Sequence, residues 1–593
     1  MRILPFLAAV SLPLALVATP AQAAPAVLGP TATGYGGAIA TVDATATAAG
    51  LDVLRHGGNA VDAALAAAAA LGVTEPFASG IGGGGFFVYY DARHHSVSTI
   101  DGRETGPATM TSTYFIDPAD GLPYDFQEAR VSGLSTGVPG TLATWDTAAR
   151  RWGTRPLASA LRQAAEVADR GFTVDATFRQ MVVDNAAAFG QFDSTRALYL
   201  PGDQPPAIGS TIRNPDLAAT YRQIAAGGLD TFYRGPIGAD LLDTVRHPPV
   251  SATPTAVWPY PIRPGVLTAR DLSSYRVNLP APTRSGFRGL DVYGMSTPSS
   301  GGTAVGEALN ILEQSGLSAT DVTKVLHYYL EASALAFADR GRYVGAYTSP
   351  EVLHKLVSDA WAKQRACQIS PTTAMVKPVP PGDIDAGGCT PAAGGDAPDK
   401  GQSTTNLTVA DKWGNVVEYT LTLEQFGGNA MVVPGRGFML NNELTDFNFT
   451  GTQGTAPDPN LPGPGKRPRS SMAPTIVLKD GAPMLATGSP GGASIITTVL
   501  QILVNRLILG MTLPEAIAAP RASQRNTPGI QAEPAFHTLY GPSLTALGHS
   551  FGPDMAELGA ATGIEFTAGG GLVAAAEPVR RGSGAAAVVH PTP

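Results

Sequence analysis

Helical spacing of apolar residues dominates the N-terminal part of the chain. An alanine-rich run at 59–73 has high helix propensity, and apolar residues recur at spacings of three and four over 157–232. The pattern shortens to strand-like alternation around 283–295, and Pro298-Ser299-Ser300-Gly301-Gly302 then opens a helix through Leu312. A further amphipathic helix is predicted from about 322 to 343. This part is therefore predicted to be rich in helices, with strands between them.

Beyond residue 403 the pattern is typical of strands. Two β-rich runs, 404–410 and 416–423, are joined by Asp411-Lys412-Trp413-Gly414-Asn415, which predicts a hairpin. Further strands are expected at 473–478 and 483–487, followed by a strongly apolar helix at 493–509. Helices combined with antiparallel strands throughout predict a layered α+β fold.

A glycine run, Ile81-Gly82-Gly83-Gly84-Gly85, precedes a short aromatic strand at 86–90. No Lys-Ser/Thr pair follows it, and no strand–GxxxxGK–helix unit is present, so the run does not fit a phosphate-binding loop. We expect the glycines to allow close packing of the backbone against another element.

Composition narrows the classes of partner. Among 593 residues, 44% are hydrophobic and 15% charged, which suits one or two large cores with a lightly charged surface. The formal charge is −8, and no long Lys/Arg run supplies the counterion release on which nucleic-acid binding relies. We therefore expect neither nucleic acid nor an anionic membrane to be the main partner.

The N-terminus fits an export signal. Arg2 gives a positive start, residues 3–18 are apolar, and Ala21-Gln22-Ala23 has the small-x-small form that signal peptidase accepts. A membrane anchor is the alternative, but Pro5 and Pro13 interrupt a stretch that is short for a hydrocarbon core of about 30 Å. We expect residues 1–23 to be a cleaved signal, with secretion to the extracellular space or the periplasm and no stable membrane insertion.

The chain has two cysteines, Cys367 and Cys389, in a Pro/Gly-rich segment at 367–398 that is the one marked shift in composition. In an oxidising compartment such a pair often forms a disulfide, and the alternative is two free thiols in a mobile loop. Because no further ligands lie nearby, no zinc site is expected, and the sequence predicts neither a metal nor a cofactor.

Several residues after 403 could carry chemistry together. A threonine that opens a strand is ordinarily only a strand former, but further polar features follow Thr404 within about a hundred residues. They are Thr422, the acids Glu424, Glu443 and Asp446, the pair Ser470-Ser471, and Gly488-Ser489-Pro490-Gly491-Gly492. The last precedes a predicted helix, so the Gly491 and Gly492 amides are candidates for an oxyanion hole. No Ser-His-Asp order or GxSxG elbow competes with this set.

Four segments of this region resemble successive signatures of the γ-glutamyltransferase family: STTNLTVADKWGNVVEYTLTLEQ, GFMLNNELTDF, GKRPRSSMAPTIV and TGSPGGASIITTVLQ. Upstream segments resemble the same family in the same order: GGNAVDAALA, SGIGGGGFFVYYD, DGRETGP, TGVPGTLATW, FYRGPIG, STPSSGGTAVGEALNIL and ASALAFADRGRYVG. The resemblance covers roughly residues 37–589. Ordered motifs of this length are a specific signal, whereas SSM or GSPGG alone would be weak.

The resemblance implies the four-layer αββα sandwich of the N-terminal-nucleophile hydrolases. It implies a precursor cut between Ser403 and Thr404 into a large subunit, 24–403, and a small catalytic subunit, 404–593, which stay together as a heterodimer in one joint domain. Cleavage would free the α-amine of Thr404, which can then serve as general base for the Thr404 hydroxyl. An intact peptide nitrogen has no basic lone pair and cannot do so.

The resemblance also implies roles for the polar residues. Thr422 would hydrogen-bond the Thr404 hydroxyl, and Arg103 would pair with the substrate α-carboxylate, which a guanidinium fork suits. Ser470 and Ser471 would complete the carboxylate pocket. The α-ammonium would be held by Glu424, Glu443 and Asp446, and the oxyanion by the amides of Gly491 and Gly492. The implied activity is γ-glutamyl hydrolysis and transpeptidation on γ-glutamyl small molecules or peptides, such as glutathione.

Alternatives remain for the roles of these residues and for the function of the protein. Arg103 could form an ordinary surface ion pair, and the acids, serines and Thr422 could have only structural roles. The chain departs from many relatives at Asn406, where they carry histidine, and in a shorter loop at 447–465, which predicts an open cleft that admits water and long donors. Other functions compatible with the residues are a β-lactam side-chain acylase of the same fold and an unprocessed, non-catalytic binding protein.

Overall fold

The computed structural model describes residues 28–386, 388–389 and 403–592. The candidate signal at 1–23 lies outside this range. Within the described part of the chain, no helix combines the length and the apolar character needed to cross a bilayer.

A large antiparallel sheet runs through the middle of the molecule. Its strands are β1 (Thr31–Thr41), β2 (Gly84–Asp91), β3 (Ser96–Asp101), β6 (Thr283–Phe287), β7 (Leu290–Gly294), β8 (Thr405–Asp411), β9 (Val416–Thr422), β10 (Thr475–Lys479), β11 (Ala482–Gly488), β14 (Thr562–Thr567), β15 (Gly571–Ala576) and β16 (Ala585–Pro591). Among the described residues they follow the order β3-β2-β9-β8-β1-β15-β14-β11-β10-β7-β6, with β16 also paired to β1.

The sheet has two halves that share β1. The first residues of β1 pair with β15, whereas Gly37 to Thr41 pair with β8. β11 and β14 lie against β8 and β9 without pairing to them, so the two halves face each other. Small side chains such as Ala38, Ala410 and Ala574 fill part of the space at this junction, which lets the backbones approach closely.

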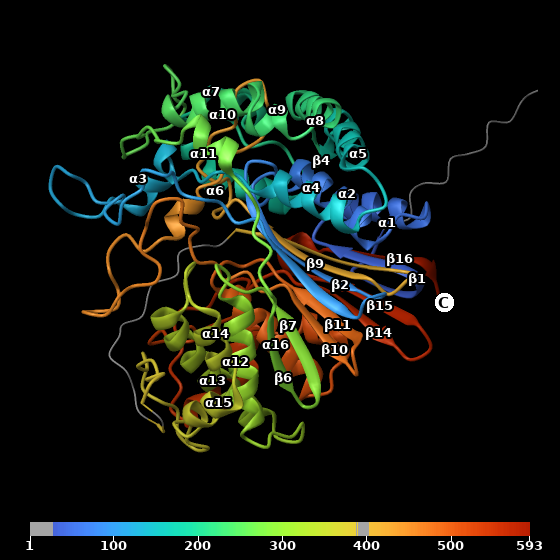
Figure 1. The fold of residues 1–593 in the computed structure, drawn as a ribbon, viewed down its shortest axis with the longest axis vertical. Coiled ribbons are helices and arrows are strands. Elements are labelled where there is room, and N and C mark those ends of the chain that lie inside the picture. The colour runs from blue at the N-terminus through green and yellow to red at the C-terminus, as the bar shows by residue number, and fades with distance from the viewer. Residues whose placement is uncertain (1–27, 387, 390–402, 593) are drawn as a thin grey trace, which may run out of the picture.

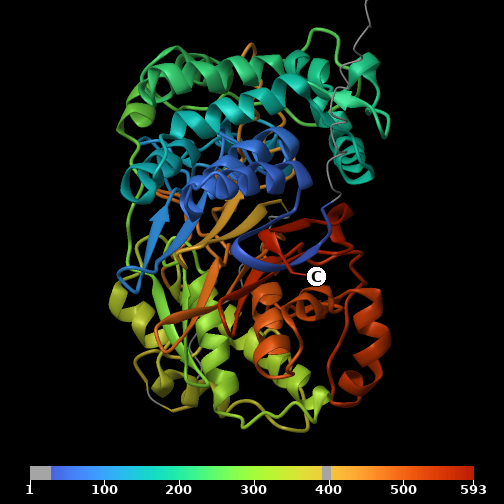
Figure 2. The ribbon, with the colours of Figure 1, turned by 90° about the vertical axis from the view of Figure 1, so that its right-hand side faces the viewer.

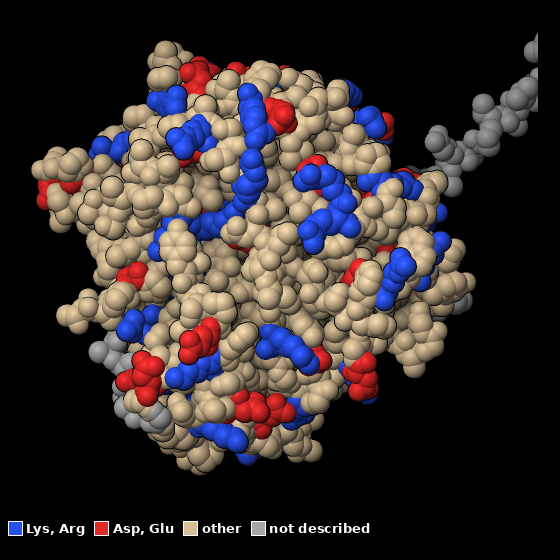
Figure 3. Space-filling model, in the orientation of Figure 1, with Lys and Arg blue, Asp and Glu red and all other residues tan. Residues whose placement is uncertain are grey.

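Helices cover the strands on two sides (Figures 1 and 2). One group packs on β1, β2, β8 and β9: α1 (Ala44–Arg55), α2 (Ala60–Thr74), α4 (Thr141–Trp152), α5 (Leu157–Arg170), α8 (Pro215–Gly227) and α10 (Pro236–Arg246). The other packs on β7, β10 and β11: α12 (Gly301–Glu313), α13 (Val322–Tyr343) and α16 (Ser494–Leu507). Additional helices include α6 (Ala176–Phe189), α7 (Asp193–Tyr199), α14 (Pro350–Leu356), α15 (Asp359–Ala366), α17 (Leu513–Ala518) and α18 (Pro534–Ala546). Acidic and basic side chains are interspersed over the face shown in Figure 3.

The predicted elements are largely confirmed. The helix at 322–343 is α13, and the hairpin after residue 403 is β8 and β9. The helical stretch at 157–232 is divided into several helices, because its sequence contains strong stop and start signals. Gly171 ends α5 at φ +81°, and the Asn214 side chain caps the first turn of α8, which Pro215 opens.

The glycine run packs directly against the backbone, as expected. A Cβ on Gly82 would lie 1.9 Å from the carbonyl oxygen of Met439, and one on Gly83 would lie 2.1 Å from that of Thr422. These distances leave no room for a side chain, so the glycines bring β2 against the end of β9. The run thereby supports the strand end that carries Thr422.

Cys367 and Cys389 form a disulfide, with their Cα atoms 6.3 Å apart. The loop between them is held to α13 by buried polar contacts. The Glu331 carboxylate accepts from the backbone N–H of Met375 at 2.9 Å and forms an ion pair with the Lys377 ammonium. The loop that leads toward residue 403 is thus fastened to the helical layer.

Gly83→Ala tests the close approach of β2 to β9. The added methyl would overlap the Thr422 carbonyl, so we expect a loss of stability of about 1–3 kcal/mol or more, with reduced activity. Thermal and denaturant unfolding measure the stability. Gly286→Ala, in β6, is the matched control because no atom lies within 4 Å of its Cβ position. Equal stability of both variants would contradict the packing described.

Candidate active site

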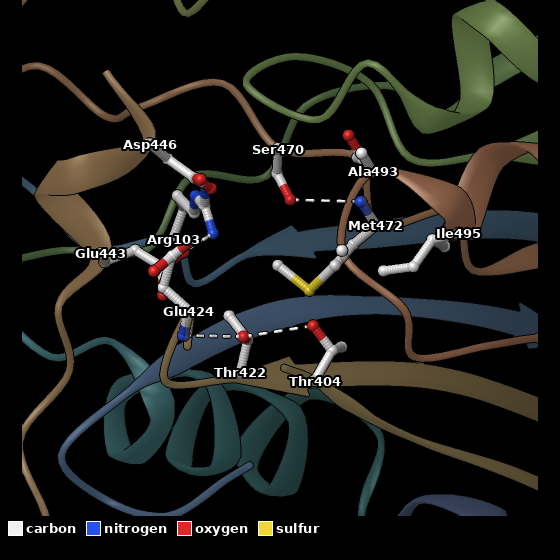
Figure 4. A pocket seen from close by; sticks show the side chains of 12 residues that line it. Arg103, Thr404, Thr422, Glu424, Glu443, Asp446, Ser470, Met472, Ala493 and Ile495 are labelled. Atoms are coloured by element: carbon white, nitrogen blue, oxygen red, sulfur yellow. Dashed lines mark hydrogen bonds and ion pairs between the residues drawn. The ribbon is translucent and has the colours of Figure 1, made fainter. Parts of the chain in front are cut away.

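The β8–β9 hairpin brings two threonines together. Thr404 immediately precedes β8, Thr422 ends β9, and the register pairs Thr405 with Leu421. The Thr404 hydroxyl donates to the Thr422 Oγ1 at 3.2 Å, and the Glu424 backbone N–H donates to the same oxygen at 2.9 Å (Figure 4). Both threonines are almost fully buried. Thr422 therefore accepts from the Thr404 hydroxyl and is itself fixed by the turn that follows β9.

The backbone on both sides of the Ser403–Thr404 bond is held in place. The Ser403 N–H donates to the Glu424 carbonyl at 3.1 Å, and the Arg581 guanidinium donates to the Thr404 carbonyl at 2.6 Å. Thr404 has φ +125°, a conformation that a β-branched residue adopts at a cost of the order of 1–3 kcal/mol. Strain at this residue is thus maintained by hydrogen bonds on either side.

Arg103 lies buried among carboxyl groups. Its guanidinium forms ion pairs with Glu443 and Asp446 and also donates to the backbone carbonyl of Arg469 at 3.0 Å. The cation and the acids, which we expected to bind opposite ends of a ligand, are therefore paired with each other here. The pocket that they line encloses only about 20 Å³.

Burial and mutual repulsion raise the pKa values of three carboxyl groups at this end of the pocket, Glu443, Glu104 and Glu424. Burial raises the pKa of Glu443 to about 8, the Arg103 charge opposes this, and Asp446 adds to it. The pKa values of Glu104 and Glu424 lie well above the ordinary range, chiefly because both carboxyls are buried. This end of the pocket therefore has capacity for additional positive charge.

The two serines are positioned by α13 and by the turn before α12. The Arg340 guanidinium donates to Ser471 Oγ at 2.8 Å and to Ser300 Oγ at 2.7 Å. Ser300 donates through its backbone N–H and its hydroxyl to the Ser470 carbonyl, and Ser470 Oγ accepts from the Met472 N–H at 3.2 Å (Figure 4). The serine hydroxyls thus face the pocket from a rigid support.

The glycines before α16 adopt left-handed backbone conformations. Gly491 has φ +136° and Gly492 has φ +57°, and their carbonyls accept from the first N–H groups of the helix. Gly492 lines the small pocket with Thr404, whereas Gly491 lines the larger cavity beside it. Glycine is required here because side chains rarely adopt such φ values.

One pocket gathers most of the residues singled out from the sequence: Arg103, Thr404, Thr422, Glu424, Glu443, Asp446, Ser470, Ser471 and Gly492. Gly491 lies next to it in the chain, Ser403 directly precedes the threonine, and the cysteine pair is not part of the lining. The structure therefore brings together residues separated by up to 389 positions in the sequence.

Sequence reasoning missed three residues that support the pocket: Glu104, Arg340 and Arg581. Glu104 follows Arg103 in DGRETGP, and Arg340 lies in ASALAFADRGRYVG, so both were within recognised segments. Arg581 lies in the C-terminal loop, outside any segment that we singled out. Its contact with Thr404 depends on the fold and has no local signal in the sequence.

Asn406, at which the sequence was expected to depart from many relatives, lies in a buried polar network. Its side-chain amide donates to Glu418 at 2.5 Å and to Thr562 at 2.9 Å, and accepts from Thr420 at 2.6 Å. Because these partners come from β9 and β14, Asn406 links the two halves of the sheet beneath Thr404. Its role in this structure is to support the strand.

The loop at 447–465 is held together by one carboxylate. Asp458 accepts from the Asn448 side chain and from the backbone N–H groups of Thr452 and Asn460, at 2.8–3.0 Å. The Asn460 side chain in turn donates to the Asp446 carbonyl at 2.7 Å. The loop is therefore held by hydrogen bonds and connected to the pocket. The open cleft expected from its shortness stays a prediction.

A second group of potential metal ligands lies outside this pocket. His327, Glu331 and His549 are buried, with ligand atoms within 4.8 Å of one another. The Lys377 ammonium already pairs with Glu331, and His327 Nδ1 lies 2.8 Å from His549 Nε2. Because Lys377 supplies a cation to this group, we assign no metal to it. The absence of a metal from the function stays a prediction.

Comparison with known proteins identifies the class. The family model for gamma-glutamyltranspeptidase matches residues 46–587. A glutathione hydrolase proenzyme of Bacillus subtilis (strain 168) is 35% identical over 532 residues, covering 89% of this chain and 87% of the relative. The acylase ACY 1 proenzyme of Pseudomonas sp. (strain V22) is 34% identical over 554 residues and 92% of each chain. A solved cephalosporin acylase from Bacillus halodurans superposes with a TM-score of 0.79 at 26% identity, over 94% of this chain and 96% of that one.

The chain belongs to the gamma-glutamyltranspeptidase family and is an enzyme. The family resemblance inferred from the ordered motifs is thereby confirmed. The mixed α/β architecture with a large antiparallel sheet is the one shared with the solved relatives.

Asp458→Ala tests how the 447–465 loop is held. Without the carboxylate, four donors lose their acceptor: the side chains of Asn448 and Thr452 and the backbone N–H groups of Thr452 and Asn460. We therefore expect faster cleavage of this loop by a nonspecific protease. Limited proteolysis with mass mapping measures the rate. Asp120→Ala, in an exposed turn, is the control and should leave that rate unchanged. A rate equal to that of the wild type for Asp458→Ala would show that other contacts hold the loop.

Proposed function

We propose that this protein is an exported γ-glutamyl hydrolase and transpeptidase that cuts itself between Ser403 and Thr404. The observation that carries the proposal is the meeting of Thr404 with a buried arginine and three acids in one pocket. An α-amino acid group carries one negative and one positive charge, and this pocket offers a partner for each. The relatives named glutathione hydrolase support the same substrate class.

Self-cleavage begins at the strained residue. The Thr404 hydroxyl adds to the Ser403 carbonyl carbon, and the peptide C–N bond breaks as Thr404 nitrogen gains a proton. Water then hydrolyses the resulting ester, which leaves a carboxylate on Ser403 and a free α-amine on Thr404. Thr422, which accepts the Thr404 hydroxyl hydrogen bond, orients the attacking oxygen. Relief of strain at φ +125° favours the step.

Turnover uses the amine that cleavage releases. The α-amine takes the proton from the Thr404 hydroxyl as its oxygen attacks the donor γ-carbonyl, and then gives the proton to the leaving amine. The Gly491 and Gly492 amides stabilise the oxyanion, aided by the N-terminus of α16. Water or an amino acid or peptide amine then accepts the γ-glutamyl group from Thr404.

Donor recognition exchanges one set of ion pairs for another. The donor α-carboxylate binds Arg103, Ser470 and Ser471, and the α-ammonium binds Glu424, Glu443 and Asp446. Because Arg103 is already paired with Glu443 and Asp446, the zwitterionic ligand inserts between charges that are satisfied in its absence. Because these groups are already buried, most of the free-energy cost of removing water from them arises on folding and not on ligand binding.

The proposed function gives each part of the chain a role. Residues 1–23 direct export, 24–403 become the large subunit, and 404–593 become the small catalytic subunit. We infer that the facing halves of the sheet and the two helical groups form the four αββα layers of one joint domain. Export would also supply the oxidising environment that keeps the Cys367–Cys389 disulfide intact.

A second candidate function is supported by the similarity to acylases. Both a relative named acylase and the solved cephalosporin acylase cover more than nine tenths of this chain. Such an enzyme would use the same nucleophile on an acyl group without an α-ammonium. Recognition of the ammonium by the acids separates the two functions.

Rates with γ-glutamyl and glutaryl anilides test the donor class. Glutaryl lacks only the α-amino group, so we expect kcat/KM for it to be at least about tenfold lower, the effect of one lost charge-assisted contact. Arg103→Lys should raise KM for the γ-glutamyl donor by a similar factor, because the bidentate fork is lost. Arg93→Lys, on an exposed turn, is the control. Equal rates with both anilides would favour the acylase function.

Denaturing gels and N-terminal sequencing test self-cleavage. Wild-type protein should resolve into two pieces, of which the smaller begins with Thr404-Thr405-Asn406. Thr404→Ala should remain one chain because it lacks the attacking hydroxyl, whereas Thr320→Ala, at an exposed position, should be cleaved normally. A fully active wild type that stays intact would contradict the proposal.

The pH dependence of L-glutamate inhibition tests the acids. The pKa of Glu443 is raised to about 8, so its carboxyl is largely protonated at pH 6 and ionised at pH 9. Because the ionised form attracts the α-ammonium, Ki should fall by roughly tenfold per unit as pH rises toward 8 and then level off. Glu443→Gln should flatten this dependence. A Ki in the wild type that is constant over this range would contradict the assignment.

A further inference from the structure

The turn after α2 reaches both sides of the Ser403–Thr404 bond. Its first residue, Glu75, forms an ion pair with the Arg581 guanidinium at 2.8 Å, and that guanidinium donates to the Thr404 carbonyl at 2.6 Å. Two residues further on, the Phe77 carbonyl accepts from Ser403 Oγ at 3.3 Å. This one turn therefore contacts the residue before the bond directly and the residue after it through Arg581.

The backbone of this turn is well fixed. It follows a helix that is buried along its whole length. The Glu75 N–H donates to the Leu71 carbonyl at 2.7 Å, and the Glu75 carbonyl accepts from the N–H groups of Ala78 and Ser79 at 3.0 and 3.1 Å. The Phe77 ring packs against three aromatic rings of α6 and α7. The Glu75 carboxylate thus has a rigid base from which to hold a partner.

Arg581 comes from a strained turn near the C-terminus. Three successive residues have left-handed φ values: Arg581 at +53°, Gly582 at +78° and Ser583 at +80°. Side chains rarely adopt such values, and strain of this kind persists where surrounding contacts impose it, commonly at functional sites. Here the Arg581 N–H donates to the Glu557 carboxylate at 3.0 Å, and the guanidinium lies 4.8 Å from the centre of the Phe426 ring. These contacts set the direction of the guanidinium.

The charge of Glu75 depends on its surroundings. The Glu75 side chain is 17% exposed and that of Arg581 is 9% exposed. Burial raises the pKa of Glu75 to about 7, the Arg581 charge opposes this, and Asp43 and Asp175, which cap α1 and α6, add to it. Glu75 is therefore mostly neutral at pH 6 and mostly ionised at pH 8. A charge-assisted contact with Arg581 is stronger than one to a neutral carboxyl group.

We propose that Glu75 is a positioning residue for self-cleavage: its carboxylate holds Arg581, and Arg581 holds the Thr404 carbonyl so that the Thr404 hydroxyl stays aimed at the Ser403 carbonyl carbon. Ionised Glu75 holds Arg581 more firmly, so self-cleavage is faster when Glu75 is charged. Neither side chain exchanges a proton with the reacting atoms, and the bonds made and broken are those already given. The inference rests on the proposed self-cleavage and adds a residue that sets its rate.

The test follows self-cleavage of full-length precursor from cell-free synthesis between pH 5.5 and 9, with denaturing gels as the readout. Glu75→Gln has nearly the shape of the protonated carboxyl group and no charge at any pH. The ratio of the wild-type rate to the Glu75→Gln rate should be close to one at pH 5.5. It should rise to about tenfold above pH 8, the effect of one charge-assisted contact. Other titrating groups act on both proteins and cancel in the ratio.

A double variant tests whether Glu75 acts through Arg581. Arg581→Gln alone should slow self-cleavage about tenfold at pH 8.5, and adding Glu75→Gln should slow it no further, because the partner is already gone. Glu565→Gln is the matched control, since it removes the ionic partner of Arg506 in β14. Its rate should equal that of the wild type at every pH.

A third variant covers a failure of Glu75→Gln to fold, which circular dichroism detects. Glu75→Asp keeps the charge but shortens its reach, so its rate should still rise with pH and level off below the wild-type rate. A constant ratio for Glu75→Gln, additive losses in the double variant, or a full wild-type rate for Glu75→Asp would overturn the inference alone. A wild type that stays intact at every pH would overturn self-cleavage, and the inference with it.

Discussion

The pairing of β8 with β9 determines where Thr404, the proposed nucleophile, lies. This register places Thr404 opposite the end of β9, within hydrogen-bonding distance of Thr422. The close approach of Gly83 to the Thr422 carbonyl holds that strand end from one side, and Asn406 links β8 to β14 beneath it. Helices, glycine run and polar network all act on this one hairpin, so a shift of a single residue in its register would separate the two threonines.

The second constraint is electrostatic. One buried guanidinium, Arg103, pairs with Glu443 and Asp446, and burial raises the pKa values of Glu443, Glu104 and Glu424. In the proposed function, a ligand that brings one charge of each sign exchanges with these ion pairs.

Local pattern was enough to predict most elements, because helix spacing, strand alternation and turn residues act over a few positions. It located α13, the β8–β9 hairpin and the close packing of the glycine run. The ordered motifs carried the family and named the residues that the pocket gathers. What local pattern could not supply was long-range contact. Arg581 reaches Thr404 from the far end of the chain, and no periodicity marks it.

The hydrogen bonds within one loop were also outside the reach of the sequence analysis. The loop at 447–465 is rich in Gly, Pro, Thr and Asn, and Asp458 accepts from several of its donors. A single half-buried carboxylate can hold a polar loop when its partners fall at the right distances, and sequence spacing alone does not reveal this. The pairing of Arg103 with Glu443 and Asp446 was unforeseen for the same reason, since these residues are more than three hundred positions apart.

The central claim is that Thr404 carries the γ-glutamyl group. Rapid acid quenching of the enzyme with a γ-glutamyl donor, followed by peptide mapping by mass spectrometry, tests it most directly. The account predicts an added γ-glutamyl mass on the peptide whose N-terminal residue is Thr404. Steady turnover with no adduct there and an adduct on another residue would contradict it.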